Sequence, residues 1–158
     1  MFSHDASAGV FENVTDALSK NPKDENAKLF SILDQLENFR TCEGAFHFKL
    51  CYPGLIHSPT GSSCNEWAQS SNPVYEKKVT GFRLLKIAFP TGSSDSTRHT
   101  WAGLKYTGKY EVASEGGYFV IGSRIAYQGK IKGPYATPRF NQDLEWVKKA
   151  ELYVKYVR

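Results

Sequence analysis

Several features that would place this chain in a familiar class of protein are missing from its sequence. No apolar run approaches the roughly 18 residues of a membrane-spanning helix, so no membrane span is expected. The 4 histidines are dispersed and no C-x-x-C or H-x-x-x-H pair occurs, so no metal site of conventional spacing is predicted. No motif predicts calcium held by loop oxygens, for instance those of Asp95 or Glu66, but such a site stays an open alternative.

A concentrated basic segment is missing as well. The net charge of the 158 residues is only +4, and the lysines and arginines are scattered along the chain. Proteins that bind nucleic acid usually gather these residues on one face or in runs. The sequence therefore predicts no nucleic-acid partner.

Catalytic motifs are also missing. Cys51 and Cys64 lie near His47 and His57 in the sequence, but no local signature of a cysteine protease surrounds them. There is no G-x-S-x-G elbow for a serine nucleophile, and no pattern selects a pair of carboxylates for glycoside chemistry. We therefore expect a protein that is not an enzyme and that holds no cofactor.

The cysteines leave several states open. Three are too few for a disulfide-dense scaffold, and their odd number leaves one over. In an oxidising compartment Cys51 and Cys64 would close the loop 52–63, with Cys42–Cys51 as the competing pair, whereas in a reducing compartment all three would be thiols. The N-terminus lacks the basic and apolar regions of a signal peptide, and the sequon at Asn13 is a glycosylation site only if the chain is secreted.

Aromatic and alternating apolar residues dominate what the chain does contain. The tyrosines (9) and phenylalanines (10) favour strand over helix. Phe46, Phe48 and Leu50 alternate with polar residues as in a half-buried strand, whereas residues 52–64 have the Pro, Gly and Ser content of a loop. Further strands are expected at 79–89, 105–112, 118–121, 125–131 and 144–157. In the last of these, apolar and other residues alternate, with Ala150, Leu152, Val154 and Tyr156 on one face and Glu151, Tyr153 and Lys155 on the other. This pattern predicts a mainly β fold, an antiparallel β-sandwich of jelly-roll type.

Two N-terminal segments show helical spacing. Their apolar residues recur at three- and four-residue steps: Val10, Phe11, Val14 and Leu18, and then Leu29, Ile32, Leu33, Leu36 and Phe39. We expect a partly helical extension over 1–23, followed by a single domain over 24–158 that begins with a helix over 24–40, capped by Asp24. That helix either packs on its own sheet or, because its stripe also fits two heptads, forms a short oligomerising neck.

The aromatic residues of the polar segments are the candidate binding groups. Exposed aromatic rings stack on sugar faces, and nearby amide and carboxylate side chains bind hydroxyl groups, which together form a shallow glycan site. The candidate ligand-binding residues are Tyr52, Trp67, Asn72, Trp101 and Tyr135. The alternative is that Trp67 and Trp101 pack inward and anchor their loops, since Trp is highly buried on average.

An ordered series of motifs extends over residues 29–158. They are FHFKLCYPG, CNEWAQSSNP, VTGF, W-x-G-L at Trp101–Leu104, IGS at Ile121–Ser123, K-x-K-G-P ending at Pro134, and AELYV at Ala150–Val154. The series resembles a poorly characterised module of extracellular multidomain proteins of cnidarians and other marine invertebrates. The resemblance implies a location outside the cell, a role as one unit of a mosaic protein and a disulfide between Cys51 and Cys64. It implies no activity, and Cys42 departs from the pattern.

These features predict a non-enzymatic, extracellular recognition module. Its partner would be a glycan or an extracellular matrix protein, bound by the aromatic-bearing loops in a shallow, wet site whose low affinity is raised by multivalency. The alternative is a structural or assembly module that forms homo-oligomers through the N-terminal helix or an edge strand.

Overall fold

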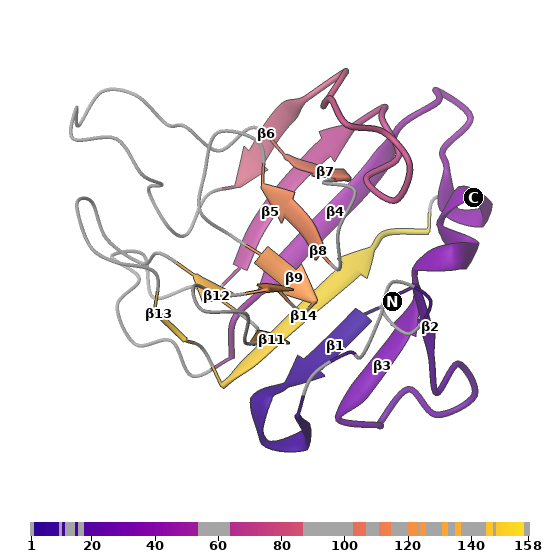
Figure 1. The fold of residues 1–158 in the computed structure, drawn as a ribbon. Helices are drawn as coiled ribbons and strands as arrows, with labels where there is room; N and C mark the ends of the chain where they lie inside the picture. The colour runs from indigo at the N-terminus through magenta and orange to yellow at the C-terminus, as the bar shows by residue number, and fades with distance from the viewer. Residues whose placement is uncertain are drawn as a thin grey trace.

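The computed structural model describes the larger part of the chain. The described residues are 2–9, 11, 15, 18–53, 64–86, 103–106, 111–114, 120–122, 124–125, 131–132, 135–136, 145–146 and 148–156. Their regular structure is mainly β, as expected, and every strand pair among them is antiparallel (Figure 1).

A seven-stranded sheet forms the main part of the fold. Its strand order is β2-β3-β1-β14-β4-β5-β6. The strands are β1 (Phe2–Asp5), β2 (Ser19–Lys20), β3 (Leu29–Ile32), β4 (Phe46–Cys51), β5 (Cys64–Gln69), β6 (Arg83–Lys86) and β14 (Lys149–Val154). The two ends of the chain therefore pair at the centre of the sheet, where β1 lies beside β14.

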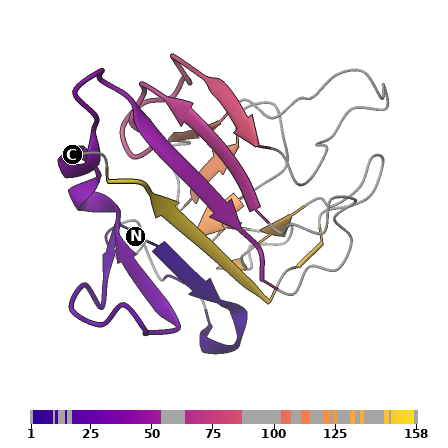
Figure 2. The same cartoon turned by 180° about the vertical axis from the view of Figure 1, so that it is seen from behind.

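A second sheet lies over one face of the first. Its order is β13-β12-β9-β8-β7, and a separate hairpin joins β10 to β11. The strands are β7 (Leu104–Tyr106), β8 (Glu111–Ser114), β9 (Val120–Gly122), β10 (Arg124–Ile125), β11 (Ile131–Lys132), β12 (Tyr135–Ala136) and β13 (Glu145–Trp146). Strands β8 and β9 lie in front of β14 and β4 in Figure 1 and behind them in Figure 2.

The expected helix over 24–40 is confirmed only in its second half. Residues Leu33–Phe39 form a 3-10 helix, η2, whereas the preceding residues form strand β3. Asp24 caps a turn rather than a helix, because its side chain accepts a hydrogen bond from the backbone N–H of Asn26 at 3.1 Å. Strand β3 pairs with β1 on one side and β2 on the other, and this pairing overrides the local helical spacing.

Two described parts of the segment 1–23 belong to the seven-stranded sheet, as strands β1 and β2. Strand β1 pairs with both β3 and β14, and Phe2 is 2% exposed. A short 3-10 turn, η1 (Ala6–Ala8), follows it. Most of the helix expected between Val10 and Leu18 lies outside the described residues.

Strand β5 was not expected, because the segment CNEWAQ has the polar composition of a loop. Its inward-facing residues are Asn65, Trp67 and Gln69, two of which are amides, so a search for alternating apolar residues misses it. The strand expected over 79–89 is shorter in the described residues, where β6 covers only Arg83–Lys86.

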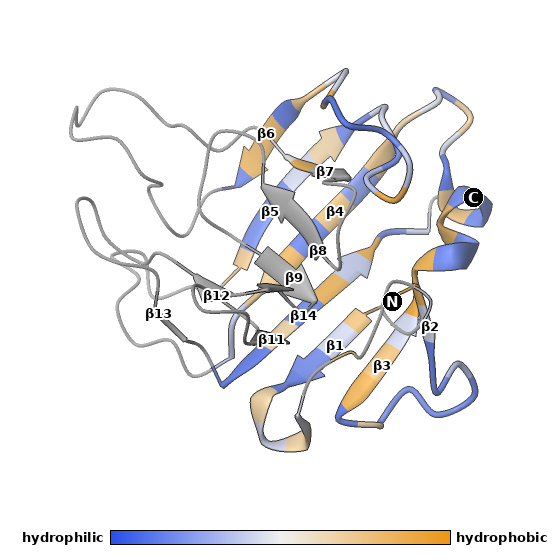
Figure 3. Ribbon diagram, viewed as in Figure 1, coloured by the Kyte–Doolittle hydropathy of each residue, from blue (hydrophilic) through white to orange (hydrophobic). Residues whose placement is uncertain are grey.

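The core lies on the face of the seven-stranded sheet that the second sheet covers. Alternate residues of β4 and β14 are buried there, as the sequence pattern predicts: Phe46, Phe48, Leu50, Ala150, Leu152 and Val154. The ring of Phe48 stacks on Trp67 with centroids 5.2 Å apart. Apolar and polar residues accordingly alternate along these strands (Figure 3). Each large side chain buried there contributes about 1.5–3 kcal/mol.

Candidate functional site

Three of the five predicted binding residues lie inside the protein. Tyr52, Trp67 and Asn72 are 1%, 0% and 2% exposed, so they do not form an exposed aromatic rim. This corrects the expectation, and for Trp67 it confirms the alternative of inward packing. Trp101 and the sequon residue Asn13 lie outside the described residues, and Tyr135 is part of β12.

The buried amide of Gln69 explains why Trp67 faces inward. The indole N–H of Trp67 donates to Gln69 Oε1 at 2.8 Å, and the same oxygen accepts the backbone N–H of Leu104 at 3.0 Å. Gln69 Nε2 donates to the carbonyls of Leu104 and Ser71, both at 2.9 Å. The side chain thus pairs with the backbone of β7 as a neighbouring strand would, and it joins the two sheets.

Gly103 makes this approach feasible. Its φ of +91° is a conformation that L side chains rarely adopt, and an added Cβ would lie 2.6 Å from Gln69 Oε1, with Val79 and Phe82 also in contact. The motifs CNEWAQ, VTGF and W-x-G-L therefore meet around one side chain. At the described residues, these motifs link β5 to β7.

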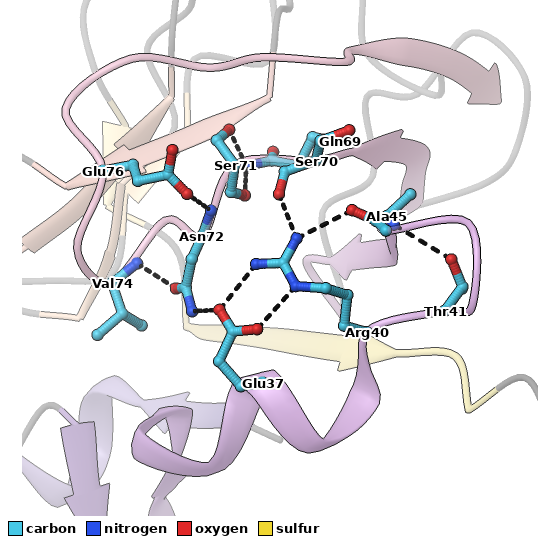
Figure 4. A network of polar contacts seen from close by, with 11 residues as sticks. Glu37, Arg40, Thr41, Ala45, Gln69, Ser70, Ser71, Asn72, Val74 and Glu76 are labelled. Carbon is cyan, nitrogen blue, oxygen red and sulfur yellow. Dashed lines mark hydrogen bonds and ion pairs between the residues drawn. The ribbon is translucent and has the colours of Figure 1, made fainter.

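A second polar network ties η2 to the loop after β5 (Figure 4). The guanidinium of Arg40 donates to both carboxylate oxygens of Glu37 at 2.7 and 2.8 Å, which lowers the pKa of Glu37 and raises that of Arg40. Asn72 Nδ2 donates to the same carboxylate at 2.7 Å, and Asn72 N–H donates to Glu76 at 2.6 Å. Arg40 also donates to the carbonyl of Ser70 at 2.6 Å. The network fixes loops in place and explains the burial of Asn72.

The disulfide that the resemblance implies is confirmed. Cys51 and Cys64 face each other across β4 and β5 and are bonded, with Cα atoms 4.0 Å apart. Cys42 is a free, exposed thiol. The bridge holds the ends of the two strands at the point where residues 52–63 connect them.

The opposite face of the seven-stranded sheet points away from the second sheet. We call it the outward face. Figure 2 looks onto it, and no described segment lies in front of β4, β5 or β14. Two cross-strand rows define its centre: Tyr153, Lys49, Glu66 and Lys86 in one, and Lys155, His47, Ala68 and Arg83 in the next. The alternation of β14 in the sequence already predicted that Tyr153 and Lys155 share a face, whereas the register between strands was not predictable.

One hollow on the outward face lies over β1, β3 and β14. We call it the N-terminal hollow, and its volume is about 440 Å³. Phe30 and Ile32 supply apolar lining, and charges of both signs surround it, including Asp5, Lys28 and Glu151. Its size falls in the range of small-ligand sites.

A second hollow lies over β4, β5, β6 and the end of β14. We call it the basic hollow, and its volume is about 270 Å³. His47, Lys49, Lys155, Glu66, Leu85 and Tyr153 contribute to its lining. Tyr153 lines both hollows, so its ring separates them.

The ring of Tyr153 is held by its neighbours on β14. Its hydroxyl donates to Glu151 Oε2 at 2.8 Å, and Lys149 Nζ lies 2.5 Å from Glu151 Oε1. Burial and this hydrogen bond raise the pKa of Tyr153 to about 12. Burial alone would raise the pKa of Glu151, but the hydrogen bonds from Lys149 and Tyr153 outweigh it and lower that pKa. The tyrosine is 45% exposed, so a fixed aromatic surface is open to solvent.

Neither a cluster of metal ligands nor a membrane-spanning helix occurs among the described residues. No group of three or more His, Cys, Asp or Glu able to hold a metal occurs among the described residues. Glu66, considered for loop-bound calcium, lies instead on β5 opposite Lys49, 3.9 Å from its ammonium, and Asp95 lies outside the described residues. No described helix is long and apolar enough to cross a membrane.

Comparisons with family models, with curated proteins and with solved structures found no match for this chain.

Proposed function

We propose that the chain is a non-enzymatic, extracellular recognition module whose binding site is the outward face of the seven-stranded sheet. The observation that carries the proposal is the position of Tyr153, an exposed ring held by Glu151 between two hollows. A fixed aromatic ring with charged and polar groups around it suits a glycan or a matrix protein bound in a shallow site. The proposed site therefore lies on the sheet rather than in the loops expected from the sequence, and the expected class of partner is unchanged.

A glycan array tests this proposal. The folded chain is presented as a multimer, with and without calcium, beside Tyr153→Ala, Tyr153→Phe and the control Tyr75→Ala. Tyr75 is 62% exposed but lies in the loop after β5, outside both hollows. We expect a coherent set of hits that Tyr153→Ala abolishes and that Tyr153→Phe and Tyr75→Ala retain, because stacking needs the ring rather than the hydroxyl. A blank array, or hits that survive Tyr153→Ala, would overturn the proposed site.

A β-sandwich of jelly-roll type is the architecture we propose for this module. Its support is the link from β5 to β7 through Gln69 and the burial of Leu104 in the same cluster as Trp67. Hydrogen exchange provides the test: the amide of Leu104 should be protected as strongly as the strand amides of β5, and Gln69→Ala should remove that protection. Fast exchange of this amide in the wild type would contradict the close packing of the two sheets.

An extracellular location is proposed together with this function. The disulfide Cys51–Cys64 supports it, since such bonds persist in oxidising compartments. Thiol titration of denatured protein, isolated from its own source under alkylating conditions, checks it. We expect Cys42 alone to react, and reaction of Cys51 and Cys64 as well would place the chain in a reducing compartment.

The assembly alternative receives less support. The apolar stripe expected on one helix is divided between β3 and η2, and its members Leu33 and Leu36 are buried in this chain's own core. The edge strands of the seven-stranded sheet, β2 and β6, are short and carry Lys20, Arg83 and Lys86, features that hinder pairing with a second sheet. We therefore expect a monomer in light scattering.

A further inference from the structure

The charges on the outward face are unevenly distributed. Around the basic hollow, four permanent cations point outward, namely Lys49, Arg83, Lys86 and Lys155, and His47 lies among them. In the two cross-strand rows of described residues that define this area, Glu66 is the one carboxylate. Glu66 lies 3.9 Å from Lys49 and forms an ion pair with it, so it does not neutralise Arg83, Lys86 or Lys155. We call this area the basic half of the face.

The basic side chains of the basic half are regularly spaced. Lys49 and Lys86 belong to one row, His47 and Arg83 to the next, and β5 separates the members of each pair. Strand spacing puts the paired Cα atoms about 10 Å apart, and two residues along a strand put the rows about 7 Å apart. A bulge between Glu66 and Trp67 leaves Leu85 as an extra residue of β6, and Leu85 and Lys86 are both exposed. This arrangement fits a linear polymer that carries an anionic group at regular intervals.

The basic half also offers a surface for a sugar ring. Tyr153 and Leu85, each 45% exposed, line the basic hollow between the cations. Aromatic and aliphatic surfaces of this kind accept the apolar face of a sugar. A sequence-independent site for single-stranded nucleic acid combines a charged groove with several stacking rings. Among the described residues that line the basic hollow, Tyr153 and Phe48 are the aromatic carbocycles, and Phe48 is buried in the core.

We infer that the ligand of the basic half is an acidic polysaccharide, whose sulfate or carboxylate groups pair with the cations while a sugar ring packs on Tyr153. This inference rests on the proposed function and names the ligand class for the same face. The N-terminal hollow, whose lining mixes Asp5 and Glu151 with Lys28 and Lys149, takes no part in it.

Titration with dextran sulfate and with uncharged dextran, in EDTA and over a series of salt concentrations, tests the inference. We expect binding to dextran sulfate alone, with the logarithm of the binding constant falling linearly with the logarithm of salt. Lys49→Gln/Lys86→Gln should weaken binding about 10-fold at physiological salt and reduce the salt slope by about 1–2, since binding releases fewer counterions when two ion contacts are lost. Lys23→Gln/Lys77→Gln removes the same charge elsewhere and should leave both quantities unchanged.

A charge change of the opposite sign sharpens the test. Glu66→Gln removes the carboxylate of the basic half and should tighten binding several-fold, whereas Glu43→Gln, an exposed acid beyond the sheet, should not. Equal responses of each variant and its control would show that net charge alone drives binding, and would overturn the assignment of the site.

Other polyanions decide the class of ligand. Polyglutamate, single-stranded DNA and vesicles containing phosphatidylserine should bind more weakly than dextran sulfate, and Tyr153→Ala should reduce the difference. Equal binding of any of them would overturn the polysaccharide assignment. If dextran sulfate does not bind but the glycan array gives hits that depend on Tyr153, this inference is overturned and the proposed function stands. If neither experiment shows binding, both are overturned.

Discussion

The two faces of the seven-stranded sheet are formed by alternate residues of the same strands, yet their roles differ. The inward face carries Phe46, Phe48 and Trp67, which are at most 2% exposed and pack against one another. The outward face carries charged and half-exposed residues such as Lys49 and Tyr153. The comparison shows which residues maintain the fold and which are available to bind.

The motifs of the ordered series described above lie mainly on the inward side. Trp67 and Gln69 of CNEWAQ, and Gly103 and Leu104 of W-x-G-L, join the two sheets from inside. These motifs therefore account for architecture, and we propose that the ligand is decided by residues between them. The following substitutions test that division of roles.

Truncation of Trp67 should have the largest effect. Trp67→Ala removes a fully buried ring that stacks on Phe48 and donates to Gln69, so we expect the free energy of unfolding to fall by about 3–5 kcal/mol. Urea denaturation measures it. The outward neighbour Lys49→Ala should change stability by no more than about 0.5 kcal/mol. Similar losses in the two variants would contradict the division between the faces.

Removal of the disulfide should have the next largest effect. Cys51 and Cys64 alternate with the inward residues of β4 and β5, but their bond still stabilises the fold strongly. Cys51 and Cys64 are separated by 13 positions. For a loop of this size, Cys51→Ala/Cys64→Ala should lower the free energy of unfolding by about 3 kcal/mol, chiefly through the larger entropy of the unfolded chain. Cys42→Ala, at an exposed free thiol, is the control and should leave the urea midpoint unchanged.

The fold was predictable from the sequence where one physical signal dominated. Alternating apolar residues in β4 and β14 indicated two strands and their buried faces correctly. The same rule missed β5, because its inward residues Asn65 and Gln69 are amides, and Gln69 finds its partner on Leu104, distant in the sequence. Helical spacing at Leu29 and Ile32 was misleading because pairing with β1 outweighed it.

The candidate site was less predictable than the fold. Tyr52, Trp67 and Asn72 were expected in loops at the surface, and their burial follows from contacts that no local pattern encodes. The outward face depends on strand register: Lys49, Glu66 and Lys86 become neighbours only after β4, β5 and β6 pair. A surface of this kind has no sequence motif, although the alternation along β14 already placed Tyr153 on it.

Gly103 offers a finer test of the inward side. Gly103→Ala imposes an unfavourable backbone conformation and brings Cβ within 2.6 Å of Gln69 Oε1. Gly44 has a similar positive φ of +79°, but nothing lies within 4 Å of its added Cβ. Gly44→Ala therefore measures backbone strain alone, about 1 kcal/mol, and Gly103→Ala should cost about 2 kcal/mol more. Equal losses in urea denaturation would show that the approach of Gln69 to β7 is not close.

The smallest expected effect concerns the Glu37–Arg40 ion pair, which belongs to the network that ties η2 to the loop after β5. The pKa of Glu37 is lowered in the folded state by its hydrogen bonds from Arg40, so the unfolded state binds this proton more readily. The stabilisation is therefore present above the ordinary glutamate pKa and is lost as the pH falls through the lowered value. Because the Glu37 side chain is 52% exposed, we expect less than about 1 kcal/mol.

Urea denaturation of the wild type and Glu37→Gln between about pH 7 and pH 3 measures this contribution. The wild type should be more stable at neutral pH, and its advantage should shrink under acid, because the amide side chain of the variant does not titrate. Glu43→Gln changes the same charge at an exposed position and should give no such convergence. If the difference between wild type and Glu37→Gln stayed constant over this range, the carboxylate of Glu37 would not be held by Arg40 and Asn72, and the network would be contradicted.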